Sequence, residues 1–164
     1  MEEFKKIYIA DDETNIRAAI KTFLESSGYI VEDFENGDLL FEAFLKEPSD
    51  LVILDVMMPG SNGFVICKEL RKISHVPIIM LTARDSDLDY ATALDLGSDD
   101  YLIKPFSPMA LTMRVKSLFR RMEFERQAHT EQPIEEQMTS EDDKEENKKI
   151  IKSRKEKRLN KKKR

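Results

Sequence analysis

The sequence predicts a doubly wound α/β domain with a five-stranded parallel sheet, followed by a charged C-terminal tail. Strand and helix patterns alternate five times through residue 122, and such alternation implies right-handed crossovers and a sheet with helices on both faces. The first, third and fourth strands are apolar throughout, as is typical of interior parallel strands. We therefore expect one folded domain over residues 1–122 and a separate tail over residues 123–164.

Each predicted strand is a short apolar or alternating run bounded by turn residues. The second strand alternates in character, which is typical of an edge strand. The third ends directly before Asp55, and Pro77 lies at the start of the fourth. In order, the expected strands cover residues 5–10, 29–34, 51–54, 76–81 and 101–103.

Each predicted helix carries apolar residues at helical spacing on one face. Gly28 and Gly97 are suitable C-terminal stops for the first and fourth helices, and Ser107 is a suitable N-cap for the last. In order, the expected helices cover residues 14–27, the segment that opens at 36–37 and closes at 48, the segment from 63 to about 73, residues 86–96, and residues 107–122.

The tail differs from the rest of the chain in its charge pattern. Residues 123–143 hold eight acidic side chains and one basic one, whereas residues 144–164 hold twelve basic and three acidic ones. The tail contains few aromatic or branched apolar residues, so it cannot bury enough surface to offset chain entropy. We expect a low-complexity segment that is disordered or forms a marginal solvated helix.

Composition limits the class of protein. The single cysteine, Cys67, cannot form an internal disulfide, which fits a reducing cytosol, and its helical setting favours the role of a small buried hydrophobe. No secretory signal is visible, and no apolar run approaches the roughly 20 residues that span a bilayer. We therefore expect a cytoplasmic protein without membrane contact.

Polar residues follow four of the predicted strands: Asp11 and Asp12, Asp55, Thr82, and Lys104. In an open α/β sheet, functional groups gather outside the carboxyl ends of the strands. Each residue alone has an ordinary explanation, such as helix capping for Asp12 or a solvated charge for Lys104. Their coincidence at four strand ends predicts a functional site.

The chemistry of this group favours phosphoryl transfer. Two carboxylates ~4 Å apart repel by about 4 kcal/mol at an effective dielectric near 20, and a divalent cation relieves that repulsion. Clustered oxygen ligands that leave positions for water suit Mg²⁺. The metal and Lys104 would neutralise phosphoryl oxygens while Asp55 attacks phosphorus. A metal-dependent phosphatase is the main enzymatic alternative, although neither a substrate pocket nor a general acid is visible beside Asp55.

The order of these motifs resembles the receiver domain of two-component response regulators, and the last helix resembles the OmpR/PhoB type. The resemblance covers residues 3–122. It implies a flavodoxin-like sheet with strand order 2-1-3-4-5. The matching segments are Ile9-Ala10-Asp11-Asp12-Glu13, residues 52–60, Asn62-Gly63, Ile79-Met80-Leu81-Thr82-Ala83, and residues 97–106.

The resemblance implies a role for each site residue. Asp55 would be the phosphoacceptor for a histidine kinase, so the protein would be a switch and not a dedicated enzyme. Thr82 would move to the phosphoryl oxygen, and Tyr101 would turn inward behind it. The implied Mg²⁺ ligands are Asp12, Asp55 and the backbone carbonyl of Met57, with Asp11 acting through water; Lys104 would pair with the phosphoryl group, and the peptide bond before Pro105 would be cis.

Two features depart from the OmpR/PhoB pattern. Such receivers commonly dimerise through the face made by the fourth helix, fifth strand and fifth helix, using a charge pair whose positions here are Thr92 and Ala110. Arg114 could still pair with Asp99 or Asp100, so we expect dimerisation to be weaker or rearranged. In addition, residues 123–164 show no pattern of the winged-helix output domain.

Three interpretations of the tail remain open at this point. The chain could be a stand-alone receiver that acts through protein contacts. Its basic terminus could bind nucleic acid electrostatically, without sequence preference. Alternatively, it could be a truncated OmpR/PhoB-type transcriptional regulator whose DNA-binding domain is missing.

Overall fold

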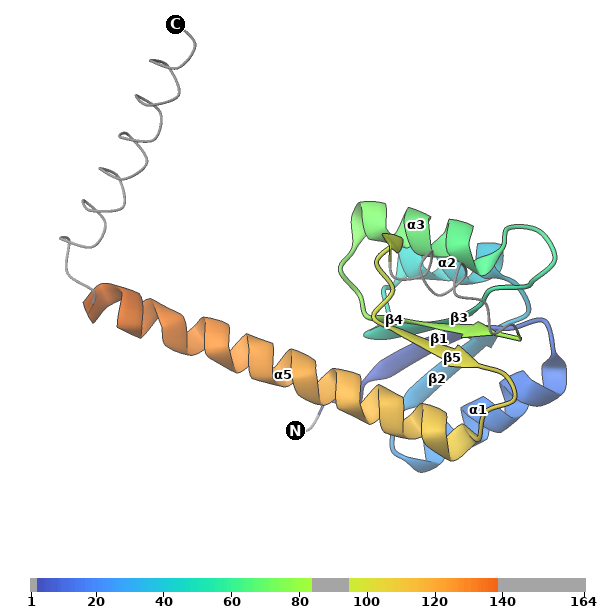
Figure 1. The fold of residues 1–164 in the computed structure, drawn as a ribbon, viewed down its shortest axis with the longest axis horizontal. Helices are drawn as coiled ribbons and strands as arrows, with labels where there is room; N and C mark the ends of the chain where they lie inside the picture. Colours follow the sequence, from blue (N-terminus) through green and yellow to red (C-terminus); the bar gives the residue numbers. More distant parts are fainter. Residues whose placement is uncertain (1–2, 84–94, 139–164) are drawn as a thin grey trace, which may run out of the picture. The chain divides into compact units, whose positions relative to one another are not determined.

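The computed structural model describes residues 3–83 and 95–138. Its sheet has five strands in the order β2-β1-β3-β4-β5, and all four strand pairs are parallel (Figure 1). This confirms the predicted fold and strand order. The strands are β1 (Lys6–Ala10), β2 (Ile30–Phe34), β3 (Leu51–Asp55), β4 (Ile78–Thr82) and β5 (Asp100–Ile103).

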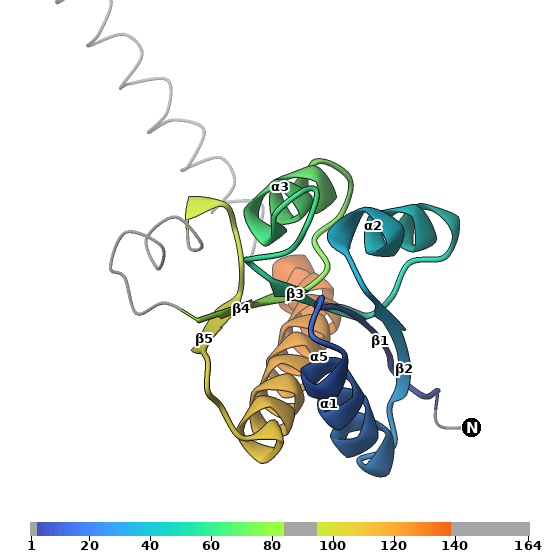
Figure 2. The same cartoon turned by 90° about the vertical axis from the view of Figure 1, so that its right-hand side faces the viewer.

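Helices cover both faces of the sheet. Helices α2 and α3 lie on one face, while α1 and the first part of α5 lie on the other (Figure 2). The helices are α1 (Thr14–Ser26), α2 (Gly37–Lys46), α3 (Gly63–Ile73) and α5 (Pro108–Met138). Most of the helix expected over 86–96 lies outside the described residues, and this part includes Thr92.

The helix starts follow the chemistry of their caps. The side chain of Asn36 accepts a hydrogen bond from the backbone N–H of Leu39, and that of Asn62 accepts one from Val65. The hydroxyl of Ser107 accepts one from Ala110 at 3.0 Å, which confirms Ser107 as the N-cap of α5. Such caps satisfy backbone donors that have no partner inside the helix.

Alternating side chains of the strands build two cores, one on each side of the sheet. On the α2 and α3 side, Tyr8, Val52 and Leu54 pack with Leu40 and Leu70. Cys67 is also fully buried in this core, as its helical setting predicted.

The opposite core joins β1 and β3 to α1 and α5. Ile7, Ile9 and Ile53 pack there with Leu24 and Val115, all with no exposed surface. The inner strands are therefore buried on both faces, and only their ends are open for polar groups.

Helix α5 departs from the sequence-based expectation. The helix was expected to end near residue 122, in front of a disordered or marginally helical tail, but it continues to Met138. The added segment, 123–138, contains no glycine and many Glu and Gln residues, which have favourable helix propensity, but it also includes Pro133, which lacks a backbone N–H for the helical hydrogen bonds. Elongation of an existing helix also avoids the cost of nucleation. Residues 139–164 of the tail lie outside the described residues.

The chain divides into two units after Phe119, within α5. In the second unit, every described side chain from 120 to 128 is exposed. None of the helices in the described ranges is both long enough and apolar enough to cross a membrane.

Candidate functional site

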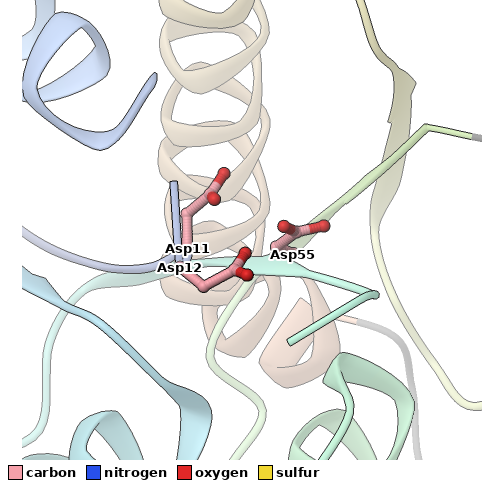
Figure 3. Close-up of side chains that lie close together, drawn as sticks. All are labelled: Asp11, Asp12 and Asp55. Atoms are coloured by element: carbon pink, nitrogen blue, oxygen red, sulfur yellow. The ribbon is translucent and has the colours of Figure 1, made fainter. Parts of the chain in front are cut away.

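The predicted carboxylates meet at the carboxyl ends of the central strands. Asp11 and Asp12 directly follow β1, and Asp55 is the last residue of β3. One carboxylate oxygen from each lies within 4.8 Å of the others (Figure 3). Asp11 has no exposed surface and Asp55 has 2%, whereas Asp12 is exposed. The structure therefore places two buried acids beside one that faces solvent.

The backbone of Asp11 is held by hydrogen bonds at both its N–H and its carbonyl. Its N–H donates to the carbonyl of Phe34 at 3.2 Å, and its carbonyl accepts from Nη1 of Arg17 at 2.7 Å. Its carboxylate oxygen Oδ1 accepts from the N–H of Glu13 at 2.9 Å. The other carboxylate oxygen points toward the site.

Asp55 is held by the turn that follows β3. Its Oδ1 accepts from the backbone N–H of Met57 at 3.3 Å. The start of α3 lies directly against it, because a Cβ on Gly63 would be 2.2 Å from the Asp55 carbonyl oxygen. The turn can close only because position 63 has no side chain. The side chain of Met57 is 63% exposed, so any role of this residue through its carbonyl leaves the side chain free.

Lys104 brings a positive charge into the carboxylate cluster. Its Nζ lies 3.0 Å from Oδ2 of Asp11, 3.1 Å from Oδ2 of Asp55 and 3.6 Å from Oε1 of Glu13. The backbone N–H of Lys104 donates to the carbonyl of Thr82 at 2.6 Å. The peptide bond to Pro105 is cis, the isomer that the resemblance implies.

Burial and charge shift the pKa values of two groups. Burial raises the pKa of Asp55 to about 6, and the negative charge of Asp11 adds to this rise, while Lys104 and the N–H of Met57 act against it. Burial alone would lower the pKa of Lys104, but its contacts with Asp11 and Asp55 outweigh burial and raise it. The lysine thus stays protonated between two acids that compete for it.

Thr82 and Tyr101 lie on the adjacent strands β4 and β5. Thr82 is the last residue of β4 and is 1% exposed, and Tyr101, in β5, is 9% exposed. The register aligns Met80 with Tyr101. Because Thr82 ends β4 and Lys104 follows β5, all five predicted polar positions lie at the carboxyl edge of the sheet.

A cavity of about 560 Å³ opens beside the cluster, between α1 and the segment that connects β5 to α5. Glu13 and Lys104 border it, and the remaining wall is mainly apolar. The apolar wall includes Ile16, Ile20 and Phe106. Asp55 is not among the residues that line this cavity, so the cavity is not a substrate pocket beside the proposed acceptor.

The donor set fits a hard divalent cation. Three carboxylates supply oxygen ligands within reach of one ion, and the exposed side of Asp12 leaves room for water. The ammonium group of Lys104 already occupies the gap between Asp11 and Asp55, which shows that positive charge is stable at this position. Asp11, Asp12 and Asp55 could therefore hold Mg²⁺.

Sequence reasoning missed two arginines with long-range contacts: Arg17 next to the site, and Arg71 at the opposite edge of the sheet, where β4 and β5 begin. Arg17 in α1 contacts the Asp11 carbonyl and also pairs with Asp33 at 2.7 Å. Arg71 in α3 donates to the carbonyl of Gly97 at 2.8 Å and pairs with Asp99 at 2.9 Å. No motif marks either arginine, since both contacts join segments that are distant in sequence.

The arrangement at the carboxyl edge agrees with the comparison to known proteins. Residues 7–116 match the family described as the response regulator receiver domain. The chain belongs to this family. Receivers are regulators and not classical enzymes, they bind Mg²⁺ at an acidic pocket, and they partner with histidine kinases in two-component systems.

Curated relatives of this receiver are transcriptional regulators. The chain is 49% identical over 117 residues to the probable transcriptional regulator ycf27 of Cyanidium caldarium, a match that covers 71% of this chain and 47% of the relative. It is 41% identical over 116 residues to the transcriptional regulatory protein ResD of Bacillus subtilis (strain 168), covering 71% and 48%. The receiver therefore spans about half the length of these relatives, which are of the predicted OmpR/PhoB type.

Solved structures show the same fold. The receiver domain of the Francisella response regulator 1452 is 36% identical, with a TM-score of 0.69 over 72% of this chain and 98% of that one. A CheY-like receiver domain protein from Methanospirillum hungatei JF-1 is 27% identical, with a TM-score of 0.71 over 75% and 99% of the two chains.

Proposed function

We propose that this receiver accepts a phosphoryl group on Asp55 from a histidine kinase in a Mg²⁺-dependent reaction in the cytoplasm. The single observation that carries the proposal is the contact of the Lys104 ammonium with both Asp11 and Asp55, at 3.0 and 3.1 Å, inside a buried carboxylate cluster. A structural ion pair needs one acid, whereas a phosphoryl site needs a free nucleophile and fixed positive charge.

The reaction forms a bond between phosphorus and a carboxylate oxygen of Asp55. The bond from phosphorus to the imidazole nitrogen of the kinase phosphohistidine breaks, and the electron pair returns to that nitrogen, which takes up a proton. Lys104 holds its proton and shields the phosphoryl oxygens from Asp11. Mg²⁺, held by Asp11, Asp12, Asp55 and the carbonyl of Met57, would supply Lewis-acid neutralisation of those oxygens.

The same proposal includes the switch. Phosphorylation would favour a state in which the hydroxyl of Thr82 bonds a phosphoryl oxygen and the ring of Tyr101 turns inward. Thr82 is well placed for this role because its carbonyl is already bonded to the backbone of Lys104 at 2.6 Å. The output surface would comprise β5, the first part of α5 and the helix expected between β4 and β5.

Self-association through that surface is a weaker part of the proposal. Arg114 lies 3.3 Å from both carboxylate oxygens of Asp100 in the same chain, and Ala110 is exposed. Asp99 is already paired with Arg71. An intermolecular pair would thus have to exchange the Arg114–Asp100 contact, which is consistent with weak dimerisation. Sedimentation showing a tight dimer that is lost in Arg114→Glu would contradict this part.

Phosphate uptake from acetyl phosphate tests the assignment of Asp55. Asp55→Ala should abolish uptake, and Asp50→Ala is the matched control because Asp50 precedes the opposite end of the same strand. Uptake should require Mg²⁺ and stop when the metal is chelated. Undiminished labelling of Asp55→Ala would refute the proposal.

A further inference from the structure

Arg17 lies behind the carboxylate cluster and contacts two other elements at once. Its side chain is only 14% exposed. Its Nε donates to Oδ2 of Asp33 at 2.7 Å, and its Nη1 donates to the carbonyl oxygen of Asp11, also at 2.7 Å. The guanidinium therefore links α1 to β2 and to the loop after β1. Charge-assisted bonds of this length are among the stronger polar contacts in proteins.

These contacts complete a closed ring around the main chain of Asp11. The N–H of Asp11 donates to the carbonyl of Phe34, and Phe34 is the neighbour of Asp33, which holds Arg17. Strand β2 thus holds the N–H of Asp11 directly, through Phe34, and the carbonyl of Asp11 indirectly, through Asp33 and Arg17. With the backbone of Asp11 held in this way, its carboxylate bonds the N–H of Glu13 and the ammonium group of Lys104 at the carboxylate cluster.

The same contacts also determine where the positive charge of Arg17 is held. An unpaired guanidinium this close to three carboxylates would turn toward them and compete with a metal cation. Asp33 prevents this by binding Nε, and its other oxygen accepts from Nζ of Lys21 at 3.2 Å. Burial works to raise the pKa of Asp33, but Arg17 and Lys21 outweigh it and lower that pKa, so Asp33 remains charged.

We propose that Arg17 and Asp33 are positioning residues for the metal-binding loop, which hold the backbone of Asp11 while keeping the guanidinium away from the carboxylates. The inference rests on the proposed Mg²⁺ site and adds two residues on α1 and β2 to it. A side chain that only stabilised the fold would not need to bond the backbone of a site residue.

Calorimetric titration of the full chain with Mg²⁺ tests the inference. Arg17→Ala should raise the Kd for Mg²⁺ about tenfold, the low end of the effect seen when a supporting partner of a metal ligand is removed. Arg17→Lys should raise it to a similar extent with a near-normal melting temperature, because one ammonium cannot reproduce the fixed fork of the guanidinium. Asp33→Ala, which frees the guanidinium, should weaken binding at least as much.

Lys21→Ala is the matched control. It removes the other cationic partner of Asp33 but leaves the bond from Arg17 to Asp11 in place, so its Kd should stay within about twofold of wild type, as expected for a partly exposed ion pair that does not touch Asp11. Melting temperatures without metal show whether each variant is folded.

Three results would overturn the inference, and each has a different meaning. If Arg17→Ala and Arg17→Lys bind Mg²⁺ as wild type does while Asp12→Asn does not, the proposed metal site stands and the positioning role is wrong. If Arg17→Lys restores affinity and Arg17→Ala loses affinity only in proportion to its melting temperature, the role is purely structural. If the wild-type chain itself fails to bind Mg²⁺, the proposed function fails as well.

Discussion

The α-carbon of Gly63 lies so close to the carbonyl of Asp55 that an added Cβ would be 2.2 Å from the carbonyl oxygen and 2.9 Å from its carbon. Both neighbours are main-chain atoms at the end of the central strand. Neither can move without shifting Asp55, so the start of α3 and the position of the proposed acceptor carboxylate are linked.

We predict that Gly63→Ala disturbs both stability and the site. Overpacking against backbone should lower the free energy of unfolding by about 1–3 kcal/mol and reduce phosphate uptake. Gly37→Ala is the matched control, because Gly37 also begins a helix after an asparagine cap, but its added Cβ would meet only side-chain atoms of Ile66 and Met58. Urea unfolding and acetyl phosphate labelling measure the two effects. Equal losses in both variants would show that the backbone contact has no special role.

We predict that Asp55→Asn stabilises the metal-free protein in a pH-dependent way. The folded pKa of about 6 is above the ordinary value of 3.8, so folding takes up a proton between these pH values and wild-type stability falls as the pH rises through them. The penalty is then complete above about pH 7, where removing the charge should add about 3 kcal/mol.

Melting temperatures measured from pH 4 to pH 8 with chelator present check this prediction. The gap between Asp55→Asn and wild type should open as the pH rises. Asp12→Asn, on an exposed carboxylate, should change the melting temperature less. A gap that is constant across the whole pH range would show that ionisation of Asp55 is not its cause.

We predict that Lys104→Met destabilises the metal-free protein by about 3 kcal/mol, because it leaves two buried carboxylates without their positive partner. Added Mg²⁺ should recover part of this loss, so the metal-dependent rise in melting temperature should exceed that of wild type. Lys72→Met removes an exposed pair with Glu69 and should change stability by less than about 1 kcal/mol. If Mg²⁺ raised the melting temperature of Lys104→Met no more than that of wild type, the metal would not be replacing the lost charge.

We predict that Arg71→Ala loosens the segment that leads into β5. Arg71 bonds the carbonyls of Gly97 and Val76 as well as the carboxylate of Asp99, so the loss should be about 2–3 kcal/mol by urea unfolding. Arg114→Ala, which removes an exposed pair, is the control and should have little effect. Faster amide exchange in β5 for Arg71→Ala alone would agree with the prediction, whereas unchanged exchange would contradict it.

The fold was predictable because the sequence patterns that identify its strands and helices are local. Apolar runs such as residues 51–54 identify buried strands, and helical spacing identifies the packed faces of α1 and α5. The observed strand bounds differ from the expected ones by one or two residues. Strand β4 runs from Ile78 to Thr82. It begins after Pro77 because proline has no N–H to donate to the neighbouring strand, and only the carbonyl of Pro77 forms a hydrogen bond, with the N–H of Val52.

The long-range ion pairs, one beside the site and one at the opposite edge of the sheet, were not predictable in the same way. Arg17 and Asp33 are 16 residues apart, and Arg71 and Asp99 are 28 apart. Each pairing depends on which rotamers the surrounding packing permits, and a single sequence does not encode that in any local pattern. The last helix was expected to end near residue 122 because apolar periodicity stops at Met122, with a disordered or marginally helical tail beyond. Helix α5 instead continues to Met138 through a segment rich in Glu and Gln that includes Pro133.

The contact between Lys104 and Asp11 joins residues 93 positions apart, and this separation has a consequence during synthesis. A nascent chain that has exposed only β1 to β3 already carries all three carboxylates but lacks their lysine. The site becomes complete only after β5 has left the ribosome and has paired with β4. A kinase would therefore find no competent acceptor on an unfinished receiver, and the phosphorylated species would report that the whole sheet has assembled.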